Sequence, residues 1–161
     1  MKAAVLTIST SVAGGTAKDA SGPLLAELAE GVGAEVVALE VIPDDLALIE
    51  DRIRQHVDDG IDLVLTTGGT GLSPDDVTPE ATRAVLERDA PGFSEAMRAE
   101  SLRHTPMGVL SRGVSGIAAQ TLIVNFPGSP KAVREAFAVV APTLEHAVAT
   151  LRGDDDRQGG G

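Results

Sequence analysis

The sequence predicts one α/β domain in which helices flank a mostly parallel β-sheet. The apolar run at residues 3–8 is typical of a strand buried on both faces, and the runs at residues 35–42 and 61–65 are predicted as the next two strands. Amphipathic helical segments at about 24–32 and 46–57 separate them, and connections of helix length favour parallel pairing of the strands. A chain of 161 residues is also long enough for one domain with a proper hydrophobic core.

The second half of the chain shows a less regular pattern. Thr78 is predicted as the N-cap of a helix, with Pro79 as its first residue. Ser129 and Pro130 repeat this signal before a last helix that Pro142 restarts or kinks. The expected elements are helices at about 78–86, 93–102 and 130–151, and strands at 109–110, 114–118 and 120–126.

Composition excludes several classes of function. The formal net charge of −11 repels a nucleic-acid backbone, and the absence of cysteine excludes disulfides, zinc–thiolate sites and iron–sulfur clusters. The apolar run near the N-terminus is too short for a signal peptide or a membrane span, so we expect a cytoplasmic protein with no membrane partner. We expect residues 1–151 to form the domain and residues 152–161 to form a disordered acidic and glycine-rich tail.

The most informative stretch is TTGGTGLSPDDVTPEAT, residues 66–82, which directly follows an apolar strand. Glycines after a strand let backbone N–H groups approach an anion closely, and ligands of parallel sheets bind beyond the carboxyl ends of the strands. The stretch lacks the lysine of a P-loop, and Pro74 stands where the dinucleotide fingerprint needs its third glycine. Asp75 and Asp76 therefore suggest Mg²⁺ as the group that balances phosphate charge, with hydroxyls of Thr67, Thr70 and Ser73 as further ligand contacts.

Simpler interpretations stand beside this one. The glycines form a tight turn in any case, and Asp75 or Asp76 can offset the dipole of the following helix. Asp44 immediately precedes a predicted helix, where N-capping is its expected role. The three histidines have no metal-ligand spacing, and we expect them on the surface.

Six motifs together resemble the MogA/MoaB family of molybdenum-cofactor biosynthesis proteins and the equivalent domain of gephyrin. These are TTGGTG, DVTPEAT, PGFSEAMRAESL and TLIVNFPGSPKAV, with KDASGPLL and the IPDD turn upstream, over about residues 3–151. The resemblance implies a three-layer α/β/α sandwich that assembles as a homotrimer. It also implies an enzyme that uses Mg²⁺ to transfer AMP from ATP to the terminal phosphate of molybdopterin, for hand-over to a molybdate-inserting enzyme.

Residue roles also follow from the resemblance. Asp76 matches the family's catalytic aspartate, and Asp44 matches a second functional aspartate; both are expected to hold Mg²⁺. The residues expected to bind the pterin or the nucleotide are Ser9, Ser21, Gly22, Thr67, Gly68, Gly69, Thr70, Gly71, Gly128 and Ser129.

Two departures from the family pattern keep a second function open. Thr10 stands where many relatives have aspartate, and Asp75 stands where many active members have an arginine that helps to bind ATP. The alternative to the enzyme is a MoaB-type accessory protein that binds molybdopterin or nucleotide without turnover. An assembly module, a role that the gephyrin domain partly has, is a third and less attractive alternative.

Overall fold

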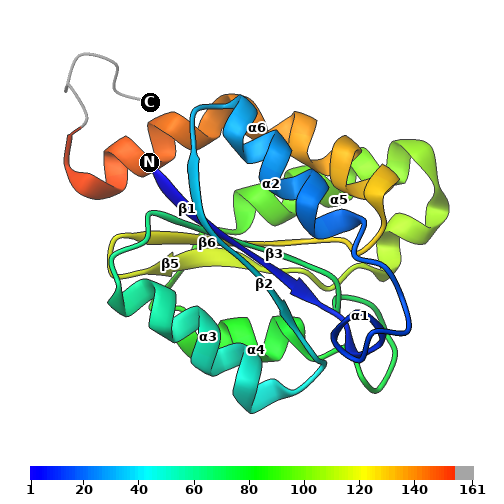
Figure 1. Ribbon diagram of the computed structural model, residues 1–161. Coiled ribbons are helices and arrows are strands. Elements are labelled where there is room, and N and C mark those ends of the chain that lie inside the picture. The colour runs from blue at the N-terminus through cyan, green and yellow to red at the C-terminus, as the bar shows by residue number, and fades with distance from the viewer. Residues whose placement is uncertain (155–161) are drawn as a thin grey trace.

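The computed structural model describes residues 1–154 and is built around a six-stranded sheet with the order β2-β1-β3-β6-β5-β4 (Figure 1). Strands β2, β1, β3 and β6 run parallel, whereas β5 and β4 are antiparallel to their neighbours. The prediction of a mostly parallel sheet is therefore confirmed. In chain order the elements are β1 (Lys2–Ile8), α1 (Thr10–Ala13), α2 (Ser21–Gly31), β2 (Glu35–Ile42), α3 (Leu46–Asp58), β3 (Leu63–Thr67), α4 (Thr78–Val85), β4 (Arg88–Asp89), α5 (Pro91–His104), the 3-10 helix η1 (Pro106–Leu110), β5 (Ser115–Ala118), β6 (Thr121–Phe126) and α6 (Pro130–Arg152).

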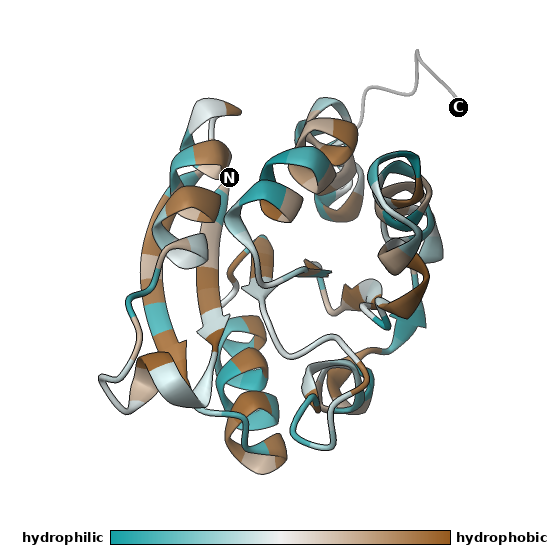
Figure 2. Cartoon of the chain, turned by 90° about the vertical axis from the view of Figure 1, so that its right-hand side faces the viewer, coloured by the Kyte–Doolittle hydropathy of each residue, from teal (hydrophilic) through white to brown (hydrophobic). Residues whose placement is uncertain are grey.

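Helices cover both faces of the sheet and give the three-layer sandwich. Helices α2, α5 and α6 lie on one face, and α3 and α4 lie on the other (Figure 1). In Figure 2 many strand residues are brown while the helices alternate between brown and teal, as expected for a sheet that lies between two layers of half-exposed helices. Among the described residues, none of the helices combines the length and the apolar character that crossing a bilayer requires.

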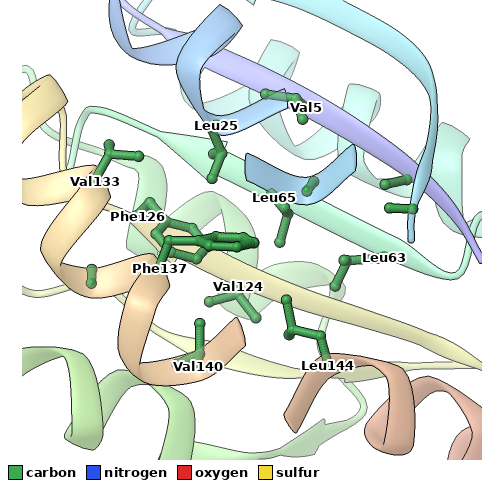
Figure 3. Close-up of a cluster of buried hydrophobic side chains, with 14 of the residues drawn as sticks. Val5, Leu25, Leu63, Leu65, Val124, Phe126, Val133, Phe137, Val140 and Leu144 are labelled. Atoms are coloured by element: carbon green, nitrogen blue, oxygen red, sulfur yellow. The ribbon is translucent and has the colours of Figure 1, made fainter. Parts of the chain in front are cut away.

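Aliphatic side chains dominate the core, as the scarcity of aromatic residues predicts. On the α2/α6 face, side chains of the sheet such as Val5 and Leu65 pack against Leu25 and Leu144 of the helices (Figure 3). The aromatic pair of Phe126 and Phe137 has ring centroids 6.0 Å apart and joins β6 to α6 in this cluster. With so few large rings, the core depends on close packing of many small aliphatic groups.

The strand order places a topological switch point between β1 and β3. The chain moves from β1 outward to β2, and then returns to β3 on the other side of β1. At such a point the loops that leave the two strands diverge and open a crevice beyond their carboxyl ends. The glycine turn follows β3, so its predicted position at the ligand-binding edge agrees with the topology.

Two local predictions were wrong. Residues 109–110 belong to η1, not to a strand. Arg152, which was assigned to the tail, is the last residue of α6 and pairs with the buried Asp62. Of the remaining predicted tail, Gly153 is the C-cap of α6, and residues 155–161 lie outside the described residues.

The short helix α1 is an addition to the predicted elements. The Ser9 hydroxyl accepts a hydrogen bond from the backbone N–H of Val12 and so caps residues 10–13.

His56 also differs from its prediction as a surface residue. It is only 5% exposed, and its Nε2 lies 2.6 Å from a carboxylate oxygen of Glu40. The guanidinium of Arg52 donates two hydrogen bonds of 2.9 Å to the same carboxylate. The group joins α3 to β2, and the periodicity of α3 could not reveal it because the partner lies on another element.

Asn125 connects the sheet to its neighbours through buried hydrogen bonds. Its amide nitrogen donates to the hydroxyls of Thr66 and Thr82, each at 3.0 Å, and its carbonyl oxygen accepts from the backbone N–H of Val114 at 3.1 Å. The Asn125 side chain therefore links β3, β6, α4 and the segment before β5.

We expect Asn125→Leu to lower the free energy of unfolding by about 1–3 kcal/mol, because it leaves the buried Val114 N–H without an acceptor. Urea unfolding followed by circular dichroism measures the difference. The exposed Gln120→Leu serves as the control and should change stability little. Equal stability of the Asn125 variant and the native protein would contradict this assignment.

Candidate functional site

The candidate site begins at the glycine turn after β3, where the backbone adopts conformations that favour glycine. Gly68 and Gly69 have φ angles of 98° and 69°. A Cβ atom at Gly68 would lie 2.4 Å from the carbonyl oxygen of Ile8, and one at Gly69 would lie 2.2 Å from the Thr78 hydroxyl. The turn is therefore packed directly against the end of β1 and the start of α4, and larger residues would displace it.

A cavity of about 290 Å³ opens beside this turn, at the carboxyl edge of the sheet. Five of the predicted binding residues line it, and they come from segments far apart in the chain: Ser9, Ser21, Thr67, Gly68 and Gly128. The other five predicted residues do not line the cavity: Gly22, Gly69 and Ser129 adjoin lining residues in sequence, and Thr70 and Gly71 follow Gly69. The hydroxyl of Thr67 donates to the carbonyl of Pro127 at 2.7 Å, so it braces the two loops.

Asp44 lies at the same edge of the sheet but does not cap α3. Its Oδ2 accepts hydrogen bonds from the backbone N–H and the hydroxyl of Thr10, at 3.0 and 2.9 Å. The cap of α3 is Asp45, whose carboxylate accepts from the N–H of Leu48. The expected capping role of Asp44 was therefore wrong by one residue, and Asp44 instead fixes the start of α1.

Asp76 is held within the loop that joins the glycine turn to α4. Its Oδ2 accepts a hydrogen bond of 3.1 Å from the backbone N–H of Ser73 and lies 2.8 Å from the place that a Cβ of Gly71 would occupy. Thr78 is the first residue of α4 and not its N-cap, and its hydroxyl donates to the carbonyl of Gly68 at 3.0 Å. This contact closes the loop onto the turn.

The two carboxylates flank the same short stretch of backbone. A Cβ of Gly69 would lie 3.3 Å from Asp44 Oδ1, and the neighbouring Gly71 approaches Asp76 in the same way. In both aspartates one oxygen has a protein hydrogen bond, whereas Oδ1 has none among the described residues. Within residues 1–154 no group of three or more Asp, Glu or His side chains gathers as a protein-only metal cage. The arrangement fits Mg²⁺, which binds through one or two carboxylates and completes its shell with water and ligand phosphates.

Sequence reasoning missed a second layer of this site, formed by Arg112 and Glu80. Arg112 lies between η1 and β5, and its Nη1 is 2.8 Å from the Glu80 carboxylate in the first turn of α4. Hydrogen bonds from Arg112 hold the pKa of the Glu80 carboxyl below its ordinary value, although partial desolvation acts in the opposite direction. No local pattern reveals this pair, because 32 residues separate its members.

Lys18 and Asp19 were also missed as separate site residues. Within the described part of the chain, Lys18 is the one cationic side chain that lines the cavity, and it is exposed. The two carboxylate oxygens of Asp19 accept from the Thr7 hydroxyl at 2.9 Å and from the Gly22 N–H at 3.0 Å. Asp19 is thereby fixed at the start of α2, whereas Lys18 is exposed at the cavity wall.

These features define an α/β protein whose candidate site, at the switch point of a parallel sheet, suits a phosphorylated ligand. The chain belongs to the family described as "Probable molybdopterin binding domain", whose pattern matches residues 4–146. It is 45% identical to the crystal structure of the molybdopterin biosynthesis enzyme MoaB from Thermus thermophilus, with a TM-score of 0.89 and coverage of 94% of this chain and 96% of that one.

Two relatives with curated names are both longer than this chain. It is 39% identical to molybdopterin adenylyltransferase of Haemophilus influenzae, over 99% of this chain and 75% of the relative. It is 44% identical to the molybdenum cofactor synthesis protein cinnamon of Drosophila melanogaster, over 94% of this chain and 25% of the relative. The chain thus spans a quarter of cinnamon and three quarters of the bacterial protein.

The Arg112–Glu80 pair should make stability depend on pH in the acid range. Because the folded pKa of Glu80 is lowered, its stabilising contribution is complete above the pKa of an unfolded glutamate, about 4.3, and is lost as pH falls through the folded value. We therefore expect the excess melting temperature of the native protein over Glu80→Gln to shrink between pH 6 and pH 3. The control Glu27→Gln removes an exposed carboxylate of α2 and should change the melting temperature little. A melting-temperature difference for Glu80→Gln that stays the same from pH 6 to pH 3 would contradict the prediction.

Lys18 should contribute charge to anion binding. We expect Lys18→Gln to weaken the binding of Mg²⁺–ATP about fivefold, since one exposed charge contact contributes about 1 kcal/mol. Calorimetric titration measures the affinity, and the variant should also lose part of the salt dependence. Lys2→Gln, at the opposite edge of the sheet, is the matched control. An equal loss of Mg²⁺–ATP affinity in both variants would show that the affinity depends on the net charge of the protein and not on the position of Lys18.

Proposed function

We propose that this chain is a molybdopterin adenylyltransferase that acts in molybdenum cofactor biosynthesis. An oxygen of the terminal phosphate of molybdopterin attacks the α-phosphorus of ATP and forms a new P–O bond. The bond from the α-phosphorus to the bridging oxygen breaks, and pyrophosphate leaves with the electron pair. The observation that carries the proposal is the pair of aspartates, Asp44 and Asp76, on either side of the glycine turn in a chain with adenylyltransferase relatives.

Such a reaction demands positioning and charge neutralisation more than a protein nucleophile. Asp76 and Asp44 would hold Mg²⁺, which when bound neutralises the charge of the reacting phosphates. Gly68 and Gly69 present backbone close to the cavity, and Lys18 adds a cation at its wall. The net charge of −11 makes this local balance necessary, because the chain as a whole repels anions.

The turnover assay uses ATP, Mg²⁺ and metal-free molybdopterin, with detection of adenylylated molybdopterin and pyrophosphate. We expect turnover, and a fall in kcat on the order of 10²–10³-fold for Asp76→Ala, since the charge stabilisation of the transition state is lost. Asp75→Ala is the matched control, because it removes the adjacent exposed carboxylate and leaves Asp76 in place.

The outcomes separate the two candidate functions. Turnover that Asp76→Ala abolishes and Asp75→Ala retains supports the enzyme and its predicted residue. Binding of molybdopterin without formation of the adenylylated product would contradict the enzyme hypothesis. It would support the alternative of an accessory protein, which the absence of the arginine at position 75 suggests.

The remaining expectations from the family are part of this proposal. They are a homotrimer, a cytoplasmic location and hand-over of the product to a molybdate-inserting enzyme. Light scattering on the purified protein tests the trimer directly: a mass of one or two chains at assay concentration would exclude it.

A further inference from the structure

One guanidinium group spans the loop that carries Asp76. Nε of Arg112 donates to the carbonyl of Gly71 at 2.8 Å, and its Nη2 donates to the carbonyl of Asp76 at 2.7 Å. The backbone N–H of Arg112 also donates to the carbonyl of Thr70 at 2.8 Å. Arg112 thus holds both ends of the segment from Gly71 to Asp76, although it lies 36 residues beyond Asp76 in the chain.

The remaining donors of Arg112 are occupied by Glu80. Nη1 lies 2.8 and 3.1 Å from the two carboxylate oxygens, and Nη2 lies 3.1 Å from one of them. A guanidinium has five N–H groups in a fixed planar arrangement. The two hydrogen bonds to backbone carbonyls and the three contacts with the Glu80 carboxylate account for all five. The charge of Arg112 is also balanced by the Glu80 carboxylate. Arg112 is therefore a poor candidate for direct contact with a ligand phosphate.

The loop has few other anchors. Residues 72–75 are exposed, and Leu72 is 64% exposed. Inside the loop, the N–H of Asp76 donates to the carbonyl of Ser73, while Asp76 Oδ2 accepts from the N–H of Ser73. The direction of the Asp76 carboxylate consequently depends on the shape of the loop, which Arg112 fixes from outside.

We propose that Arg112 is a positioning residue for Asp76, held in place by Glu80, and that it acts on turnover without binding substrate. This inference rests on the proposed adenylyltransferase function for its kinetic consequence. Arg112 belongs to the segment before β5, and its guanidinium contacts the loop only through backbone carbonyls. It does not replace the phosphate-binding arginine that many relatives have at the position of Asp75.

Kinetics with the full chain separate positioning from substrate binding. We expect Arg112→Gln to lower kcat by about 10–100-fold and to raise the Mg²⁺ concentration for half-maximal rate, with KM for ATP and molybdopterin within about threefold of the native values. Arg112→Lys, which keeps a cation and up to three donors, should restore part of kcat. Arg103→Gln, which removes a largely exposed arginine paired with Glu100, is the matched control and should leave all constants unchanged.

Two kinetic results would overturn the proposal. A raised KM for either substrate with unchanged kcat would make Arg112 a substrate-binding residue. Unchanged kcat, KM and Mg²⁺ dependence in Arg112→Gln would leave it no role in turnover.

Hydrogen–deuterium exchange tests the loop independently of activity. In Arg112→Gln, amides of residues 71–78 should exchange faster than in the native protein, while the strands keep their protection, because the guanidinium contacts the loop and α4 and no strand. Equal exchange of this loop in both proteins would refute the positioning role. Native protein without turnover would instead refute the proposed function, and the exchange result would still decide whether Arg112 orders the loop.

Discussion

The site depends on the close approach of three backbone segments at the carboxyl edge of the sheet. Gly68 lies against the carbonyl of Ile8, and the Cβ that Gly128 lacks would be only 3.3 Å from the Gly68 Cα. The loops after β1, β3 and β6 lie this close because a side chain at Gly68 would overlap the carbonyl of Ile8 and one at Gly128 would press on the Gly68 backbone. Parallel pairing of these strands brings the loops to one edge, and the two glycines set how closely the backbone segments beside the cavity approach one another.

A strongly acidic chain that binds anions must concentrate its favourable charge locally. Asp44 and Asp76 each use Oδ2 in hydrogen bonds with the protein, and Oδ1 of each has no such bond among the described residues, while Asp19 has both oxygens occupied. Lys18 is exposed at the cavity wall, whereas the guanidinium of Arg112 is fully engaged by the protein. The cation exposed at the cavity and the cation that contacts the loop backbone are therefore different residues.

The sequence predicted the architecture and the edge at which the site lies, because alternating apolar periods and glycine turns are local signals. It did not predict how individual polar side chains are used. Asp44 and Asp45 are equivalent as capping residues on pattern alone, and only the contact with Thr10 separates them. Burial of His56 and the role of Arg112 depend on partners at least 16 residues away, where no periodicity connects them. The assigned roles of Asp76 and the cavity residues stay predictions until the chemistry is measured.

The pairing of Arg152 with Asp62 has a consequence for how such a domain can be joined to others. Asp62 also accepts a hydrogen bond from the backbone N–H of Lys2, so the first strand and the last helix meet at the amino edge of the sheet, opposite the cavity. A polypeptide fused before β1 or after α6 would be attached at the edge of the sheet opposite the cavity. The geometry is thus compatible with longer relatives such as cinnamon, in which the matching region is a quarter of the chain.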